Sequence, residues 1–278
     1  MIQDKGEVAM YIKKASGERE PFSSQKFVRS LKNAGADDRL IAEIQSKLKD
    51  QLSTIHSTKQ LYGIALNYLQ DKNPVVACRY NLKQALFLLG PTGFPFEKFA
   101  ARIFTQQGYD CTIDQMMQGK CVEHEVDIIA LKNDHHLLVE CKFHHVAGLK
   151  VDVTVPLYVK ARCNDIEAVA GKKTDIWIVT NVKFTADAIR YAQCVNIHLL
   201  GWSYPADKNL QLLIDQFNLH PITAFPDLSI KHKRYLVEHG LVFCRDAANY
   251  SHVLQKLGFG AQEIEQFINA CHQVCRIT

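Results

Sequence analysis

The spacing of hydrophobic positions changes twice along the chain, and each change predicts a different kind of structure. Over residues 10–89, apolar side chains recur three or four positions apart, which is typical of helices that bury one face. A charged segment with a Ser-Gly turn precedes them and predicts a hairpin over residues 10–22. The helices are expected over the ranges 24–33, 38–52, 59–70 and 74–89, with Thr58 as the N-cap of the third.

The breaker cluster Gly90-Pro91-Thr92-Gly93 marks the first predicted domain boundary, and helices alternate with strands after it. We expect strands over 109–113, 124–131, 136–143, 175–180 and 196–201, and helices over 94–107, 157–169 and 185–194. This order predicts a mixed sheet with crossover helices. After Phe225-Pro226 the pattern gives three short helices, over 229–239, 246–257 and 261–274. The predicted fold is therefore a multi-domain α/β protein with domains 1–90, 91–225 and 226–278.

Composition narrows the class of protein. The chain of 278 residues is 47% hydrophobic and 22% charged, as in globular proteins with a sizeable core. Its longest apolar runs are too short for a membrane span, and its first residues lack the apolar region of a signal peptide. The nine cysteines are odd in number and scattered, which favours reduced thiols. We expect a cytoplasmic protein with no membrane partner.

The charge is distributed unevenly. Residues 1–90 carry 14 Lys and Arg against 9 Asp and Glu, whereas residues 91–215 carry 13 against 15. The basic N-terminal segment suits an anionic ligand. The slightly acidic middle segment is compatible with carboxylates gathered around a metal ion.

Two neighbouring predicted strands carry the candidate chemistry. On the second, Glu140 and Lys142 share one face and Cys141 lies on the apolar other; on the first, Asp127 lies opposite Val126, Ile128 and Ala130. A hairpin would place the two carboxylates and the lysine side by side. Such a pattern is also compatible with ordinary surface charges.

Phosphodiester cleavage uses this combination of groups. Asp127, Glu140 and the Cys141 carbonyl offer oxygen ligands for Mg²⁺ or Mn²⁺, and Lys142 is suited to orient or help deprotonate the attacking water. Glu97, on the helix over 94–107, can add an outer carboxylate to a second metal ion. A zinc site through the Cys121/His124 and Cys141/His144 pairs is disfavoured, because Cys141 and His144 point to opposite faces of a strand.

Residues 92–203 resemble a PD-(D/E)xK phosphodiesterase domain of the Mrr-like restriction endonuclease type. The matching stretches are FEKFAARIFTQQGYD, EVDIIAL, LLVECKFH, DIWIVTN, FTADAIRYAQ and NIHLLGW. The resemblance implies a Mg²⁺-dependent DNA endonuclease with Asp127, Glu140 and Lys142 as its core and Glu97 as a helix acid. Many Mrr-type domains have Gln at the position of Glu140.

The first 90 residues resemble an ATP-cone, a regulatory nucleotide-binding module. The resemblance rests on IKKASGEREPFSSQK, HSTKQLYGIALNYL and VACRYNLKQAL, with one extra residue before Gly17. It implies that basic side chains contact the triphosphate and that a helix N-terminus offers hydrogen-bond donors to the nucleotide. It also implies that an acidic side chain accepts hydrogen bonds from the base or the ribose. The positions are Lys13, Lys14, Glu20, Lys26, Thr58 and Lys83. The absence of a Walker-type loop predicts binding of ATP or dATP without hydrolysis.

These observations predict a nucleotide-regulated, Mg²⁺-dependent endonuclease that cuts double-stranded DNA as a homodimer. The helix over 157–169, with Lys160 and Arg162, is a candidate for phosphate contact or the dimer face. The C-terminal helices are expected to contact DNA or to mediate dimerisation. Two alternatives remain open: a nucleotide-sensing DNA-binding regulator with an inactive nuclease fold, and a structure-specific or RNA-directed nuclease.

Overall fold

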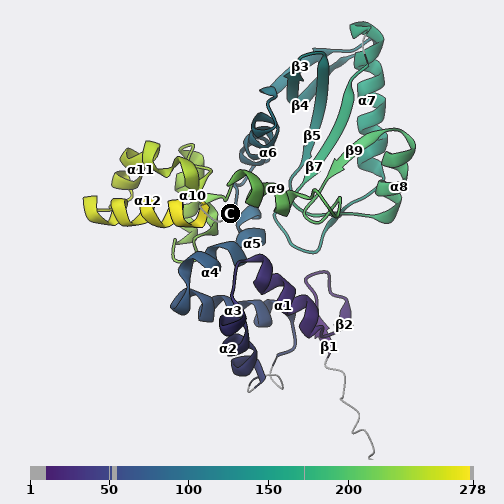
Figure 1. Cartoon of the computed structure of the whole chain (residues 1–278). Helices are drawn as coiled ribbons and strands as arrows, with labels where there is room; N and C mark the ends of the chain where they lie inside the picture. Colours follow the sequence, from purple (N-terminus) through teal and green to yellow (C-terminus); the bar gives the residue numbers. More distant parts are fainter. Residues whose placement is uncertain (1–10, 50, 52–54, 172, 276–278) are drawn as a thin grey trace, which may run out of the picture. The chain divides into compact units, whose positions relative to one another are not determined.

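The computed structural model describes residues 11–49, 51, 55–171 and 173–275, and it divides the chain into two compact units, residues 1–81 and 82–278 (Figure 1). This division falls before the Gly90–Gly93 cluster. The reason is that Leu82, Leu86 and Leu89 are buried in the core of the second unit. The C-terminal helices also belong to that unit, because Val242 and Phe243 join the same core. The three-domain division made from the sequence stays a prediction.

The first unit consists of a hairpin and a group of helices. Lys13 pairs with Arg19 in the hairpin, and Gly17, at φ +86°, takes the left-handed position in its turn. Lys14 N–H closes this turn on the Glu18 carbonyl oxygen at 2.8 Å, so the extra residue before Gly17 is accommodated. The elements are β1 (Tyr11–Lys13), β2 (Arg19–Pro21), α1 (Ser24–Asn33), α2 (Asp38–Lys49), α3 (Thr58–Lys72) and α4 (Pro74–Tyr80).

Two sequence predictions in this region are wrong in detail. Ser57, not Thr58, caps α3: its hydroxyl accepts from the Gln60 N–H, and Thr58 is the first helical residue. The helix expected over 74–89 breaks at Asn81, which is buried and accepts a hydrogen bond from the Tyr62 hydroxyl. Leu82–Leu86 (α5) is a separate helix of the second unit.

A five-stranded mixed sheet forms the centre of the second unit. The strand order is β3-β4-β5-β7-β9; the first three strands run antiparallel to one another, and β7 and β9 continue parallel to β5. The strands are β3 (Asp110–Gln118), β4 (Glu123–Lys132), β5 (His135–Lys142), β7 (Asp175–Thr180) and β9 (Ile197–Leu200). The predicted mixed sheet is confirmed, and β3 is longer than expected.

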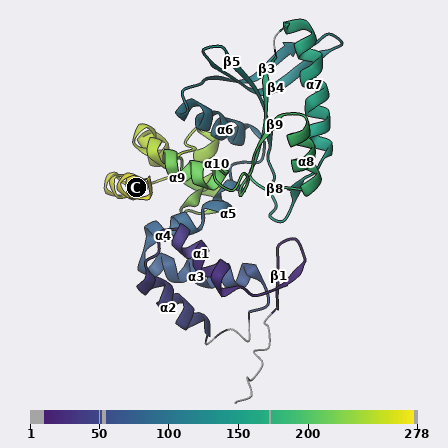
Figure 2. The same cartoon turned by 45° about the vertical axis from the view of Figure 1, so that its right-hand side comes forward.

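Helices cover both faces of this sheet. Helix α6 (Phe94–Gln106) packs on one face together with α9 (Leu210–Phe217), while α7 (Thr154–Ala170) and α8 (Ala186–Cys194) cover the other (Figures 1 and 2). Thr185 caps α8 as predicted. A short parallel pair, β6 (Lys150–Val151) with β8 (Lys183–Phe184), flanks α7 and α8.

The C-terminal part of the second unit is helical, as predicted. Ser229 caps the first helix, and the helix expected over 246–257 is instead a 3₁₀ segment, Cys244–Tyr250, that leads into α11. The α-helices are α10 (Ile230–Glu238), α11 (Ser251–Lys256) and α12 (Ala261–Cys275). None of the helices in the described ranges has both the length and the apolar character needed to cross a membrane.

Helix α7 also holds the turn between β3 and β4. The Asp165 carboxylate accepts hydrogen bonds from Cys121 N–H at 3.0 Å and from Val122 N–H at 3.4 Å, and it contacts His124 Nε2 at 2.8 Å. Gly119 lies directly beneath this carboxylate. A Cβ at Gly119 would lie 2.2 Å from Asp165 Oδ2 and 2.6 Å from the Val122 carbonyl oxygen. The turn therefore requires glycine at this position.

We predict that Gly119→Ala destabilises the protein by about 1–3 kcal/mol, the usual cost of overpacking a fixed site. Urea unfolding of the full chain measures this change. Gly260→Ala is the matched control, because the nearest atom to its added Cβ is a Glu263 side-chain oxygen at 3.5 Å. Equal stability of the two variants would show that Asp165 does not fix the turn.

Candidate active site

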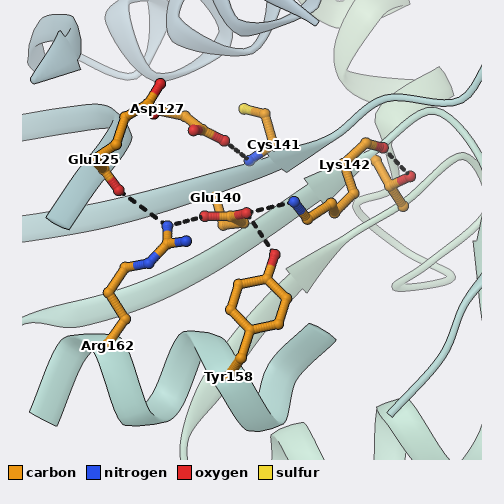
Figure 3. A network of polar contacts seen from close by, with 8 residues as sticks. Glu125, Asp127, Glu140, Cys141, Lys142, Tyr158 and Arg162 are labelled. Atoms are coloured by element: carbon orange, nitrogen blue, oxygen red, sulfur yellow. Dashed lines mark hydrogen bonds and ion pairs between the residues drawn. The ribbon is translucent and has the colours of Figure 1, made fainter. Parts of the chain in front are cut away.

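The register between β4 and β5 places two carboxylates opposite each other. The hairpin turns through Asn133, at φ +52°, and Asp134, so that Lys132 pairs with His135. The ladder runs from there to the Ile128–Val139 pair and ends. Asp127 and Glu140 are the next residues on the two strands. Asp127 then accepts a hydrogen bond from the Cys141 N–H through Oδ2, at 2.6 Å (Figure 3).

The strand alternation predicted for β5 is confirmed, and the one predicted for β4 is wrong at one position. Leu137, Val139 and Cys141 pack in the core under α6, while Leu138 packs in the core under α7. On β4, however, Val126 joins the α7 side although Ile128 joins the α6 side. The change occurs at Asp127, one residue past the last β4–β5 pair, although β4 stays paired with β3 on both sides of it.

Glu140 is buried and fully engaged by neighbouring side chains. It is 5% exposed. Its Oε1 accepts from Lys142 Nζ at 2.7 Å and from the Tyr158 hydroxyl at 2.6 Å, and its Oε2 accepts from Arg162 Nη1 at 2.5 Å (Figure 3). Three donors thus compensate the desolvation of this carboxylate.

The other two acids of the site, Asp127 and Glu97, form no ion pair within the described ranges, and their pKa values differ from the usual ones. Burial, followed by the charge of Glu140, raises the pKa of Asp127 to about 6. Burial and then the charges of four acids, Asp127 foremost, raise the pKa of Glu97 to about 7. Glu97 is in the first turn of α6, and this helix brings it within electrostatic range of the strand carboxylates.

Lys142 is held as an ammonium ion. Burial disfavours its charge, but the hydrogen bonds to Glu140 and Tyr158 outweigh burial and raise the pKa of Lys142 above its ordinary value. Burial and the bond to Glu140 likewise raise the pKa of Tyr158 to about 12. In this arrangement Lys142 is a hydrogen-bond donor to Glu140.

The donor set fits a hard divalent cation. Asp127, Glu140 and the Cys141 carbonyl offer oxygen ligands, and Glu97 lies within electrostatic range of both side-chain carboxylates. In an extended strand the N–H and C=O of a residue point to the same side, so the Cys141 carbonyl lies on the side of Asp127. Within the described part of the chain, no three His, Cys, Asp or Glu side chains are already arranged as a metal site.

Residues 90–202 match the Mrr catalytic family, described as restriction endonuclease, and residues 220–275 match the family described as AF1548-like, C-terminal. An uncharacterized protein of Archaeoglobus fulgidus is 35% identical over 179 residues, which span 63% of this chain and 98% of that protein. The chain belongs to the AF1548-like family.

One solved structure is similar in fold and in sequence. The AF1548-like chain resembles the crystal structure of AF1548, a protein of unknown function, with 32% identity, a TM-score of 0.55, and coverage of 66% of this chain and 98% of that chain. Two further solved structures are less similar to this chain. One is VC1899 from Vibrio cholerae, with 14% identity, a TM-score of 0.32, and coverage of 70% of this chain and 56% of that chain. The other is Can2 from Sulfobacillus thermosulfidooxidans in complex with cyclic tetra-adenylate, with 16% identity, a TM-score of 0.34, and coverage of 72% of this chain and 64% of that chain.

The second unit of the AF1548-like chain therefore has a restriction-endonuclease-like nuclease fold, for which nucleic acid is the implied substrate. The zinc alternative finds no support in the described residues. His124 is bound to Asp165, and Cys141 is buried against the α6 core. Cys121 is exposed on the β3–β4 turn.

The residues proposed to bind nucleotide are only partly brought together. In the first unit, Glu20 is paired with Lys14 at 2.7 Å and lies 3.6 Å from Lys26 Nζ, so its carboxylate is engaged by lysines. The Thr58 hydroxyl donates to the Lys13 carbonyl oxygen at 3.5 Å, which joins α3 to the hairpin. Lys83 belongs to the second unit, where its ammonium lies 5.8 Å from the centre of the Trp202 ring. Neither family match extends into residues 1–89.

Sequence reasoning missed Tyr158 and gave Arg162 a different role. Both side chains project from α7 toward Glu140, one helical turn apart (Figure 3). The i, i+4 spacing of a tyrosine and an arginine was visible in the sequence. Only the packing of α7 over β5 shows that both contact Glu140.

In metal-free buffer, Asp127→Asn is expected to stabilise the protein at pH 8 more than at pH 5. Because the pKa of Asp127 is raised to about 6 in the fold, folding favours the protonated acid. The contribution of protonated Asp127 to the free energy of unfolding is complete below about pH 4, the ordinary pKa of Asp. It is lost as the pH rises through about 6, the pKa of Asp127 in the fold. The variant should gain on the order of 1–3 kcal/mol at pH 8.

Urea unfolding with EDTA at the two pH values measures this difference. Asp187→Asn on α8, where the carboxylate is 65% exposed, is the control and should show no such pH dependence. Destabilisation of Asp127→Asn at pH 8 would contradict the electrostatic assignment.

Proposed function

We propose that this AF1548-like chain is a Mg²⁺-dependent DNA endonuclease that ATP or dATP regulates through its N-terminal region. The observation that carries the proposal is the placement of Asp127 opposite Glu140 at the point where β4 and β5 separate, with Lys142 on the same strand. The nuclease family match over residues 90–202 supports the same reading.

Each side chain has a distinct part in the proposed hydrolysis. Asp127, Glu140 and the Cys141 carbonyl would hold Mg²⁺, which when bound supplies charge stabilisation at the scissile phosphate. Lys142, kept as an ammonium, donates to a phosphate oxygen or to the attacking water. Glu97, with a pKa of about 7, is suited to accept a proton from that water near neutral pH. Water then adds to phosphorus while the bond to the leaving oxygen breaks.

Regulation is proposed for the hairpin side of the first unit. Lys13, Lys14 and Lys26 gather positive charge around Glu20, and Thr58 begins a helix next to them. A triphosphate would offer these lysines more negative charge than Glu20 does. Because cleavage of both strands of a duplex needs two active sites, a homodimer is the expected assembly and nucleotide binding is expected to alter it.

Cleavage assays on plasmid, linear duplex, single-stranded DNA and RNA test the nuclease. We predict nicking or cutting of DNA with Mg²⁺ or Mn²⁺, little turnover with Ca²⁺, and a loss of about a thousandfold or more in Asp127→Ala, Glu140→Ala and Lys142→Ala. Glu97→Ala should lose less. Arg190→Gln, on the exposed surface of α8, is the control and should cut like wild type.

The outcomes separate the candidate functions. Full activity in EDTA, or an active Glu140→Ala, would remove the metal assignment. Preferential cleavage of RNA would favour an RNA-directed nuclease. Nucleotide-sensitive DNA binding without any cleavage would favour a regulator with an inactive fold.

Nucleotide binding is tested separately by calorimetry with ATP and dATP. We predict binding without phosphate release, lost in the double variant Lys13→Ala, Lys26→Ala because the triphosphate loses two cationic contacts. Lys32→Ala is the matched control, since Lys32 lies at the other end of α1 and is paired with Asp38. Absence of binding to the wild-type chain at millimolar nucleotide would end this part of the proposal, whatever the nuclease does.

A further inference from the structure

Arg162 lies where β4 and β5 separate. Its Nη1 donates to the Glu125 carbonyl oxygen on β4 at 3.0 Å and to Glu140 Oε2 on β5 at 2.5 Å (Figure 3). The ladder between the two strands has already ended at the Ile128–Val139 pair. Beyond that pair, the Arg162 guanidinium and the Asp127–Cys141 hydrogen bond connect the two strands.

The charges around Arg162 are those of a cation site. Glu140 is 5% exposed and Arg162 contacts one of its oxygens, while the guanidinium also lowers the pKa of Asp127 against the larger effects of burial and Glu140. The Arg162 side chain is only 25% exposed. A carboxylate that stays ionised when it is buried needs a compensating partner, and for Glu140 the Arg162 guanidinium is one such partner.

We propose that Arg162 is a resident counter-ion that a divalent metal displaces from Glu140. Arg162 holds Glu140 Oε2 in the structure, and it would give up this oxygen when Asp127 and Glu140 hold a divalent cation. This inference rests on the proposed function and adds to it a built-in competition that sets the metal concentration at which the site fills.

The competing explanation is that Arg162 only positions Glu140, and the two differ in the sign of one effect. If Arg162 positions Glu140, its removal frees the carboxylate to rotate and weakens metal binding. If Arg162 competes, its removal deletes a positive charge beside the acids and strengthens binding of a divalent cation. Tyr158 offers a useful contrast, because its hydroxyl bonds Glu140 Oε1 without carrying charge.

Binding of Mn²⁺ alone to the full-length protein, measured by calorimetry and by electron paramagnetic resonance of free Mn²⁺, decides the sign. We expect Arg162→Gln to bind Mn²⁺ about tenfold more tightly than wild type, as the loss of one nearby positive charge requires. Arg162→Lys, which keeps the charge, and Tyr158→Phe, which removes only a hydrogen bond, should stay within about threefold of wild type. The double variant Asp127→Asn, Arg162→Gln should not show the tighter Mn²⁺ binding expected of Arg162→Gln alone.

Equal or weaker binding in a folded Arg162→Gln overturns the proposal, as does an equal gain in Arg162→Lys. Circular dichroism checks the fold, and Arg162→Met, which keeps the apolar stem of the side chain, replaces Arg162→Gln if that variant does not fold. Arg190→Gln controls for the change in net charge.

Cleavage gives a second readout. The Mg²⁺ concentration for half-maximal activity should fall in Arg162→Gln. If the wild-type chain cuts no nucleic acid, the proposed function fails, but the Mn²⁺ measurement still decides whether Arg162 competes with the metal.

Discussion

The pairing of β4 with β5 is the constraint on which the candidate site depends. A two-residue turn at Asn133 and Asp134 sets the register, and a shift by one residue would send every side chain of one strand to the opposite face. In the observed register the ladder ends one pair before Asp127 and Glu140. The two carboxylates therefore belong to residues just past the end of the β4–β5 ladder. There the Cys141 N–H donates to the Asp127 side chain.

Helix α7 supplies two of the side chains that bind the Glu140 carboxylate. Strand β5 lies inside the sheet, with helices on both faces, so Glu140 is buried instead of lying on an open acidic surface. An isolated carboxylate in that position would carry a large desolvation cost. Tyr158 and Arg162 offset this cost from α7, and Lys142 does so from the strand itself. On the other face, α6 brings Glu97 near Asp127 without a cation, and both pKa values rise.

The same helix links the chemistry of the site to the stability of the sheet. Asp165, less than one turn beyond Arg162, holds the β3–β4 turn through backbone N–H groups, and Arg162 ties β4 to β5 through the Glu125 carbonyl. Helix α7 thus connects three strands by polar contacts in addition to its buried apolar face. Displacement of Arg162 from Glu140 would leave the Asp165 contacts in place, so the sheet is held independently of the state of the site.

The sequence by itself determined the order of helices and strands in the nuclease fold and the nearness of Asp127, Glu140 and Lys142, because period-two alternation and a short turn are local properties of the chain. It did not reveal the break at Asn81, whose buried side chain accepts a hydrogen bond from Tyr62, nineteen positions away. Tertiary structure alone decided the partners of Glu140. Tyr158 and Arg162 reach it only because α7 packs across β5, and the pairing of distant side chains depends on that packing and not on local periodicity.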